Sequence, residues 1–202
     1  MIAIIDYDGG NTKSVSNVLK RCNIKFCVTN KENEICDSDK IILPGVSNFS
    51  FCMNSLKKYN LDNIIKKETI EKKKPLLGIC SGMQVLGTHS EEGNESGLNL
   101  IPGKIVKFPM EKCKIVPHVG WNRISFKDND LSKKIENFTR FYFCHSYFFL
   151  PNDANHIIMK AFYSINFCCG IKRENIYGIQ FHPEKSLYYG MTILKNFSKI
   201  RS

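Results

Sequence analysis

Short apolar runs alternate with amphipathic stretches through the first eighty residues. Four apolar runs are predicted to be strands: Ile2–Ile5, which we expect to be buried, Lys25–Val28, Lys40–Leu43 and Leu76–Ile79. The stretches between them carry apolar residues at helical spacing, over Asn11–Cys22, Phe51–Leu56 and Leu61–Ile70. This β-α-β-α-β order predicts a parallel sheet with helices on both of its faces.

After Gly97 the pattern changes to short β-branched and aromatic runs separated by turn residues. These runs predict further strands, some of them antiparallel, over Lys104–Phe108, Asn122–Phe126, Arg140–Cys144, Ile157–Phe162 and Phe167–Ile171. A last strand is predicted over Ile176–Gln180 and a closing helix over Ser186–Ile200. With no repeat or linker in sight, we expect one α/β domain over residues 1–202. Its central sheet is mostly parallel and flanked by helices, with additional antiparallel strands in the second half.

Length and composition narrow the class of protein. The 202 residues suit one substantial core. The opening Met1–Asp6 segment lacks the basic lead and long apolar core of a signal peptide, and no stretch is long and apolar enough to cross a bilayer. The nine cysteines are odd in number and include no Cys-x-x-Cys pair. We therefore expect a soluble cytoplasmic protein with mostly buried thiols, no metal site and no membrane partner.

The net charge of +10 has two readings. It could mark a nucleic-acid partner, or it could reflect solvated lysines such as those in Glu71–Lys74. No segment interleaves basic residues with aromatic ones, and no nucleic-acid signature is present, so we expect no nucleic-acid partner. An electrostatic contribution to docking a protein partner stays open.

Cys80 lies on a predicted strand-to-helix turn. The strand Leu76–Ile79 precedes it and a helix is predicted to begin over Met83–Gly87. Gly78 and Gly82 would make room for the close backbone contacts of such a turn. The helix N-terminus would favour a thiolate, and the N–H of the next residue, Ser81, would be placed to donate to an oxyanion. The alternative is a buried structural thiol between two turn glycines.

His182 and Glu184 follow the last predicted strand. In extended geometry residues two apart point to the same side, so Glu184 would accept a hydrogen bond from one ring nitrogen while the other faces a sulfur. A His-Pro-Glu segment alone would more often be a surface turn. Together with Cys80, however, the two residues complete the nucleophile, the acid–base group and the orienting carboxylate of a thiol-based acyl transfer.

The motifs resemble a known family. The segment Gly78-Ile-Cys-Ser-Gly-Met-Gln84, followed by Phe181-His-Pro-Glu184, resembles the class I (triad) glutamine amidotransferases. Further segments resemble the glutaminase subunits of imidazole glycerol phosphate synthase: Asp6-Tyr-Asp-Gly-Gly-Asn11, Leu43-Pro-Gly-Val46, Ser90-Glu-Glu92, Ile101-Pro-Gly103, Val116-Pro-His-Val-Gly-Trp-Asn122, His145-Ser-Tyr147 and Gln180-Phe-His-Pro-Glu-Lys-Ser186. The resemblance covers nearly the whole chain, and the segment that ends at Asn122 discriminates best.

The resemblance implies a reaction. L-glutamine would be hydrolysed to glutamate without a cofactor, and the ammonia would pass to a barrel-shaped synthase partner that joins it to a nucleotide of histidine biosynthesis. Cys80 would attack the side-chain amide, His182 would transfer the protons and Glu184 would hold His182.

The same resemblance assigns the remaining site residues. Those implied for the oxyanion and the substrate are Gly45, Val46, Ser47, Ser81, Gln84, Ser146 and Tyr147. Those implied near the subunit contact are Trp121, Asn122, Tyr142 and Lys185. Trp121 and Tyr142 could instead be plain core aromatics.

Three positions depart from the family's usual pattern. Ser47 and Asp8 stand where glycine is usual, and Ser81 replaces a commonly apolar residue. The peptide at Ser47 is one that the family is expected to turn over to complete the oxyanion hole, and glycine would ease that flip. These departures also fit a diverged paralogue that feeds ammonia to an enzyme aminating or amidinating sugars of surface glycans. A non-catalytic scaffold subunit and a thiol hydrolase acting on peptides are further alternatives.

Overall fold

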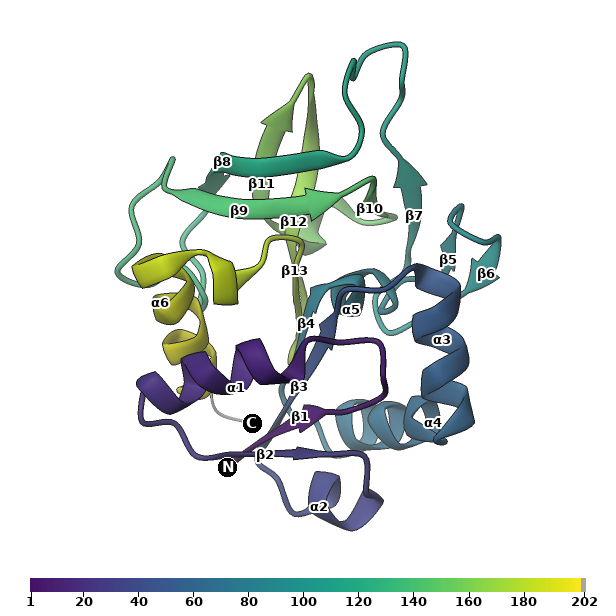
Figure 1. Cartoon of the computed structure of the whole chain (residues 1–202), viewed down its shortest axis with the longest axis vertical. Coiled ribbons are helices and arrows are strands. Elements are labelled where there is room, and N and C mark those ends of the chain that lie inside the picture. The colour runs from purple at the N-terminus through teal and green to yellow at the C-terminus, as the bar shows by residue number, and fades with distance from the viewer. Residues whose placement is uncertain (201–202) are drawn as a thin grey trace.

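The computed structural model describes residues 1–200, so the last two positions of the predicted domain lie outside it. The apolar runs form a parallel sheet at the centre of the molecule (Figure 1). Its strands lie in the order β2 (Phe26–Thr29), β1 (Ile2–Ile5), β3 (Lys40–Gly45), β4 (Leu76–Cys80) and β13 (Ile176–Ile179). The predicted parallel order of the first four strands is therefore confirmed.

Strand β13 pairs in parallel with β4, although a hundred residues separate them in sequence. Ile176 lies opposite Leu76, and Ile179 lies opposite Ile79. The residues that follow the two strands therefore emerge at the same edge of the sheet. This pairing brings the predicted thiol and the predicted imidazole to one place.

Helices cover both faces of the parallel strands, as predicted (Figure 1). One face packs against α1 (Thr12–Arg21) and α6 (Leu187–Ser198). The other packs against α2 (Glu32–Cys36), α3 (Phe49–Lys58) and α4 (Leu61–Lys66). Side chains that alternate along a strand serve both layers, because Ile4 of β1 belongs to the first apolar cluster and Ile5 to the second.

Antiparallel strands continue the sheet beyond β13. They are β12 (Ile165–Arg173), β10 (Tyr147–Pro151) and β7 (Gly103–Lys107). The short β5 (His89–Ser90) then pairs in parallel with β7, and β6 (Glu95–Ser96) pairs antiparallel with β5. From β12 a second branch of the sheet leads through β11 (Ile157–Tyr163) and β8 (His118–Phe126) to β9 (Arg140–His145). A short 3-10 turn, η2 (Ala154–His156), comes directly before β11. The fold class is the predicted one, a mostly parallel centre with antiparallel strands in the second half.

Several local elements differ from the sequence prediction. The helix expected over Leu61–Ile70 ends at Lys66 and continues as a π-helical turn, η1 (Lys67–Glu71). The helix expected to begin at Met83–Gly87 is instead a single turn, α5 (Ser81–Gln84). The short elements α2, β5 and β6 were not predicted, because apolar residues do not recur at a regular spacing in these segments. Strand β10 was not predicted either, although its sequence is aromatic.

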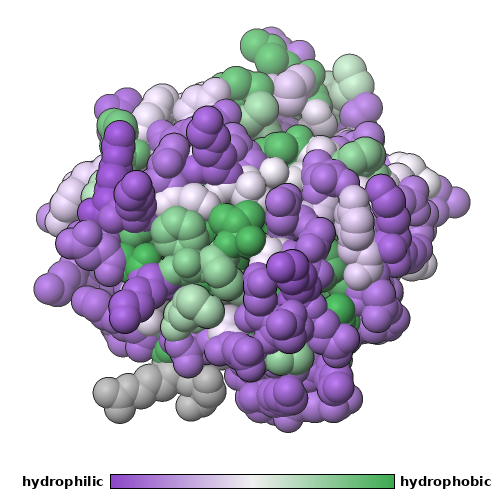
Figure 2. Space-filling model, turned by 60° about the horizontal axis from the view of Figure 1, so that its bottom comes forward, coloured by the Kyte–Doolittle hydropathy of each residue, from purple (hydrophilic) through white to green (hydrophobic). Residues whose placement is uncertain are grey.

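Figure 2 shows one face that is mostly hydrophilic, with a hydrophobic patch near its middle. None of the helices within residues 1–200 is both long and apolar enough to span a membrane. All nine cysteines are free thiols, and most are buried as predicted, but Cys144 in β9 is exposed.

Candidate active site

Cys80 ends β4 in a strained backbone conformation. Its φ is +54° and its ψ is −114°, a left-handed region that a residue with a side chain rarely adopts. A Cβ on Gly78 would lie 2.4 Å from the carbonyl oxygen of Gly82, and a Cβ on Gly82 would lie 1.9 Å from that of Leu43. Both positions therefore need glycine, which confirms the prediction of a tight elbow around Cys80.

The expected helix dipole at Cys80 is much reduced. A macrodipole needs several aligned peptide units, and α5 has only four residues before the chain turns away. The helix predicted to begin over Met83–Gly87 is only this one turn, so the dipole that was expected to favour a thiolate at Cys80 is small. The groups that can stabilise a charged sulfur here are the neighbouring side chains.

His182 and Glu184 form a close pair beside Cys80. The ring Nδ1 of His182 lies 2.8 Å from Oε1 of Glu184, and the two side chains are only 4% and 3% exposed. The backbone between them is not extended, because Pro183–Lys185 forms one 3-10 turn, η3. The contact is the predicted one, but its cause differs: the turn, and not strand alternation, brings the carboxylate to the ring.

The surroundings of His182 favour its protonated form. Burial alone would lower its pKa, but hydrogen bonds with the Cys80 sulfur and with Glu184 raise the pKa of His182 to about 10. At neutral pH the ring is therefore an imidazolium held between a sulfur and a carboxylate. Because Nδ1 faces Glu184, Nε2 is the nitrogen that serves Cys80.

A pocket of about 360 Å³ opens above Cys80. The predicted site residues that line it are Val46, Ser47, Cys80, Ser81, Gln84, Ser146, Tyr147, His182 and Lys185. Gly45 lies under it, opposite Cys80 in the β3–β4 pairing. Residues that the sequence reasoning did not assign also line it: Asn48, Glu92, Cys144 and His145. Of these, Glu92 and His145 belong to segments that carried the family resemblance.

The loop after β3 turns its N–H groups away from the pocket. The N–H of Val46 donates to the carbonyl of Gly9 at 2.9 Å, and that of Ser47 donates to the same oxygen at 3.3 Å. The hydroxyl of Ser81 donates to the carbonyl of Ser47 at 2.6 Å. Two of the residues that depart from the family pattern, Ser47 and Ser81, therefore contact each other and hold this loop conformation.

Gln180 is a buried pocket-side residue to which the sequence reasoning gave no role. Its Nε2 lies 3.7 Å from the Cys80 sulfur, and its Oε1 accepts a hydrogen bond from Nε2 of Gln84 at 3.1 Å. Nε2 of Gln84 also donates to the carbonyl of Tyr147 at 2.9 Å. The position of Gln180 directly after β13, one residue past Ile179, could have indicated a side chain at this edge.

Trp121, Tyr142 and Lys185 form an exposed cluster beside the pocket, which we call the Trp121 cluster. Trp121 is 46% exposed and meets Tyr142 edge-on at 6.1 Å between ring centroids. Nζ of Lys185 lies 5.3 Å from the centre of the Tyr142 ring. Trp121 is thus not a core aromatic, and Tyr142 is only partly buried. Asn122 follows Trp121 on β8 and is half-buried.

Asp8 adopts a conformation that glycine would adopt easily. Its φ is +67°, and its carboxylate accepts a hydrogen bond from the hydroxyl of Tyr59 at 2.8 Å. Aspartate tolerates this region better than most residues with a side chain. The departure from the family's usual glycine is therefore accommodated locally.

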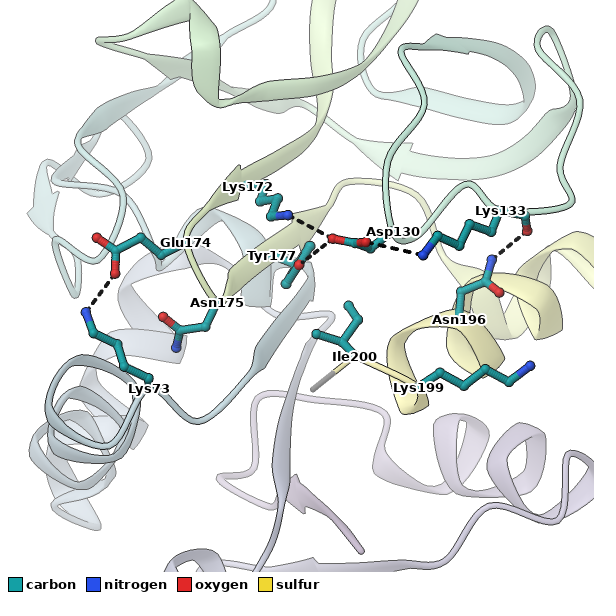
Figure 3. Close-up of a pocket in the computed structure, with 10 residues that line it drawn as sticks. All are labelled: Lys73, Asp130, Lys133, Lys172, Glu174, Asn175, Tyr177, Asn196, Lys199 and Ile200. Atoms are coloured by element: carbon teal, nitrogen blue, oxygen red, sulfur yellow. Dashed lines mark hydrogen bonds and ion pairs between the residues drawn. The ribbon is translucent and has the colours of Figure 1, made fainter. Parts of the chain in front are cut away.

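A larger pocket, of about 600 Å³, lies at the opposite end of β4 and β13 (Figure 3). Three of its four lysines form ion pairs: Lys172 with Asp130 at 2.8 Å, Lys133 with Asp130 at 3.5 Å and Lys73 with Glu174 at 2.7 Å. The lining residues, all within the described part of the chain, include neither cysteine nor histidine. Of these two pockets, the larger has no cysteine, and the smaller is the one that contains the Cys80 thiol. In the described range no three His, Cys, Asp or Glu residues are grouped to hold a metal ion.

Comparison with known families and sequences finds full-length similarity. The family model for class-I glutamine amidotransferases matches residues 3–200. The imidazole glycerol phosphate synthase subunit HisH of Leptospira borgpetersenii is 42% identical over 99% of this chain and 100% of its own length. The subunit named HisH 2 of Methanococcus maripaludis is 42% identical over 98% of this chain and 99% of its own. HisH 2 of Pseudomonas aeruginosa is 40% identical over 99% and 100%.

Solved structures share the fold at lower identity. A glutamine amidotransferase crystal structure superposes with a TM-score of 0.78 at 14% identity, covering 98% of this chain and 97% of that one. The PurLQS structure from Thermotoga maritima superposes with a TM-score of 0.77 at 18% identity, covering 97% and 96%. At such identities the likeness concerns the fold alone.

Proposed function

The chain belongs to the class-I glutamine amidotransferases, and on that premise we propose that it is the glutaminase subunit of an imidazole glycerol phosphate synthase in histidine biosynthesis. The family predicted from the motifs is thereby confirmed. Relatives that carry the subunit's name and match over nearly their whole length support the finer assignment. The observation that carries the chemistry is the 2.8 Å contact of His182 with Glu184 at a pocket of about 360 Å³ that His182 and Cys80 both line.

In the first half of the proposed reaction, the Cys80 thiolate attacks the side-chain amide carbon of glutamine. The carbon–sulfur bond forms and the carbonyl becomes an oxyanion. His182, which starts as an imidazolium, gives its Nε2 proton to the amide nitrogen as the carbon–nitrogen bond breaks. Ammonia leaves, and a glutamyl thioester remains on Cys80.

In the second half, water replaces the sulfur. The now neutral His182 takes a proton from the water that attacks the thioester carbonyl. The carbon–sulfur bond breaks, glutamate leaves, and the thiolate–imidazolium pair is restored. Through both halves Glu184 keeps the Nδ1 proton in place and stabilises the charged ring.

The oxyanion would be bound by the N–H of Ser81 and by an N–H of the Gly45–Val46–Ser47 loop. Because the N–H groups of Val46 and Ser47 donate to Gly9, a peptide of this loop must turn over before it can serve. Gln84 and the backbone of Ser146 and Tyr147 would hold the substrate. Glu92 adds a carboxylate to the pocket wall that suits the α-ammonium of glutamine.

The ammonia would pass to a barrel-shaped synthase partner. The Trp121 cluster, with Asn122 next to it, lies beside the pocket mouth and offers exposed aromatic surface for that subunit contact. Lys185 belongs to the cluster and also lines the pocket, so a partner bound there would reach the site directly.

Substitution of the two pocket cysteines tests the chemistry. Cys80→Ser should abolish ammonia release from glutamine and labelling by diazo-oxo-norleucine, because the hydroxyl is a far weaker nucleophile. Cys144→Ser is the matched control, since Cys144 lines the same pocket but is an exposed thiol in β9. Activity should require the synthase partner and its nucleotide ligand.

Three results would contradict parts of the proposal. Ammonia transfer that survives Cys80→Ser would support a scaffold subunit instead. Labelling of Cys80 by peptide electrophiles as well as by the glutamine analogue would support a peptide hydrolase. Full glutaminase activity of the isolated chain would refute control by the partner.

A second candidate acceptor is a sugar precursor of surface glycans. The one observation in its favour is the contact between Ser47 and Ser81, because both residues differ from those usual in the family. The test is to purify the chain with its bound partner and supply either the histidine-pathway nucleotide or a sugar precursor. Ammonia incorporation into the nucleotide supports the first assignment, and incorporation into the sugar supports the second.

A further inference from the structure

Two buried histidines next to each other have no part in the triad: His145, which lines the pocket, and His118, which does not. His118 in β8 is 3% exposed and His145 in β9 is 6% exposed, and they face each other across the β8–β9 pairing. Nδ1 of His118 lies 3.0 Å from Nε2 of His145. The ring of His118 is stacked between Phe143 and Tyr163, at 4.8 Å and 4.1 Å between centroids. Both rings are therefore fixed in orientation.

The hydrogen bonds determine where the ring protons are. The carbonyl of Tyr147 lies 2.8 Å from Nδ1 of His145 and can only accept, so this nitrogen carries a proton. Burial lowers the pKa of His145 to about 3 and that of His118 to about 4, so both rings are neutral. Nε2 of His145 must then accept, and Nδ1 of His118 must donate to it.

The outer end of this chain is Asn122. Nε2 of His118 is left as an acceptor and lies 3.2 Å from Nδ2 of Asn122. The orientation of that amide is set by its other contacts, because Nδ2 donates to the carbonyl of Phe162 at 2.8 Å and Oδ1 accepts from the N–H of Arg123 at 2.7 Å. All donors from Asn122 inward therefore point in one direction.

The inner end reaches the nucleophile. The Tyr147 carbonyl that receives the His145 proton also accepts from Nε2 of Gln84 at 2.9 Å. Gln84 in turn donates to Gln180 at 3.1 Å, and Gln180 lies 3.7 Å from the Cys80 sulfur. A continuous set of hydrogen bonds thus joins the half-buried edge of β8 to Cys80.

We propose that His118 and His145 are positioning residues, which hold the Tyr147 carbonyl and, through it, the side chains of Gln84 and Gln180 around Cys80. An imidazole suits this task because it carries a donor and an acceptor on opposite edges and remains uncharged in an apolar layer. The kinetic consequence rests on the proposed glutaminase function, since Gln84 and the backbone of Tyr147 would contact glutamine.

The kinetic test uses the full chain with its synthase partner and counts active sites by diazo-oxo-norleucine labelling. His118→Phe keeps the stacking but removes both hydrogen bonds, and should raise KM for glutamine roughly ten-fold per labelled site, as expected for loss of buried hydrogen bonds. His118→Gln, which retains a donor and an acceptor, should recover part of that loss. Tyr163→Phe is the matched control, because it keeps its ring on His118 and loses only the hydroxyl contact to Ile115; its KM should stay within about two-fold of wild type.

Equal effects of His118→Phe and Tyr163→Phe, or an unchanged KM in His118→Phe, would overturn the proposal. A merely structural role would lower thermal stability and the number of labelled sites while leaving KM per site unchanged. These kinetic outcomes separate positioning from folding.

Nitrogen NMR of the histidine rings tests the proton arrangement without any enzyme assay. In the wild-type chain both rings should be neutral Nδ1–H tautomers from about pH 5.5 to about pH 8. An Nε2–H tautomer of either ring, or titration in that interval, would reverse or break the chain of donors and refute the proposal. If the chain lacked glutaminase activity, the proposed function would fail while this measurement would still decide whether the hydrogen-bonded chain exists.

Discussion

His182 has two partners that both favour its charged form, the Cys80 sulfur and Glu184. This residue shows how single contacts set the chemistry of the site. Burial opposes the charge, and the two partners more than offset it, so the pKa of His182 rises to about 10. In the proposed reaction, the proton that His182 holds is the one that the leaving ammonia would take.

The raised pKa predicts a pH dependence of stability. The folded-state pKa of about 10 exceeds the ordinary 6.5, so the imidazolium stabilises the fold fully below pH 6.5, and this contribution is lost as the pH rises through about 10. The urea midpoint of the wild type should decrease as the pH rises from 6.5 to about 10. In His182→Gln the part of this decrease that His182 causes should be absent. Parallel curves for the two proteins would contradict the prediction.

Ser81 offers a second test at the residue scale. Its hydroxyl holds the Ser47 carbonyl and so stabilises the loop conformation in which the Val46 N–H faces Gly9. Ser81→Ala should raise glutaminase activity of the isolated chain about five-fold, because one hydrogen bond that opposes the flip is lost. Ser38→Ala removes a comparable bond to the Ile35 carbonyl far from the site and should change nothing. A drop in activity of Ser81→Ala would refute the role of this contact.

At the scale of elements, a buried ion pair fixes the start of β4. Glu68 in η1 is fully buried and lies 2.7 Å from Nζ of Lys74, which also donates to the carbonyls of Ile35 and Cys36 at the C-terminal end of α2. Burial would raise the pKa of Glu68, but hydrogen bonds from Lys72, Lys74 and Cys36 lower it to about 2. The π-helical turn thus joins α2 and the strand that carries Cys80.

Removing one partner of this pair should destabilise the fold. Lys74→Met should lower the free energy of unfolding by about 3 kcal/mol, because it leaves a buried carboxylate short of a partner. Lys72→Met is the control: its side chain is 51% exposed, and its loss should cost less than about 1 kcal/mol. Urea unfolding near neutral pH measures both. An equal decrease in the free energy of unfolding in the two variants would show that the burial of Lys74 does not increase the stabilisation by its ion pair.

The sequence predicts some elements well and others poorly, for physical reasons. Ile2–Ile5 and Leu76–Ile79 were predictable because strands buried on both faces are apolar throughout. The elbow was predictable because backbone contacts exclude a Cβ at Gly78 and Gly82.

Contacts set by tertiary packing were not predictable. The 3-10 turn at Pro183–Lys185 and the single turn after Cys80 depend on neighbours distant in sequence. Gln180 gave no signal of its own, since a buried glutamine is recognised only once its partners Gln84 and Cys80 are in place. The rotation of the Val46 peptide toward Gly9 is likewise a property of the folded loop.

At the scale of the whole molecule, the chemistry and the exposed aromatics share one end of the sheet. The pocket opens at the carboxyl ends of β3, β4 and β13, and the Trp121 cluster lies beside it. The opposite end holds the larger pocket, with the ion pairs of Lys172 with Asp130 and of Lys73 with Glu174 (Figure 3). A partner that covers the Trp121 cluster would therefore also cover the pocket mouth.

This arrangement predicts where the synthase partner binds. Trp121→Ala should weaken the complex by about 2 kcal/mol or more, as truncation of a central aromatic usually does. Ile70→Ala is the control, since Ile70 is 52% exposed but lines a pocket at the far end, beside Asn175. Titration calorimetry with the synthase partner measures both. An unchanged dissociation constant for Trp121→Ala would place the contact elsewhere.

The pairing of β13 with β4 also has a consequence for protein synthesis. During translation Cys80 leaves the ribosome about a hundred residues before His182, and the edge of β4 that will receive β13 is open until residues 176–179 arrive. Until then the thiol has neither its imidazole nor the strand that shapes its turn. A chain interrupted before that point would carry the nucleophile without the means to use it, so unfinished copies would not waste glutamine.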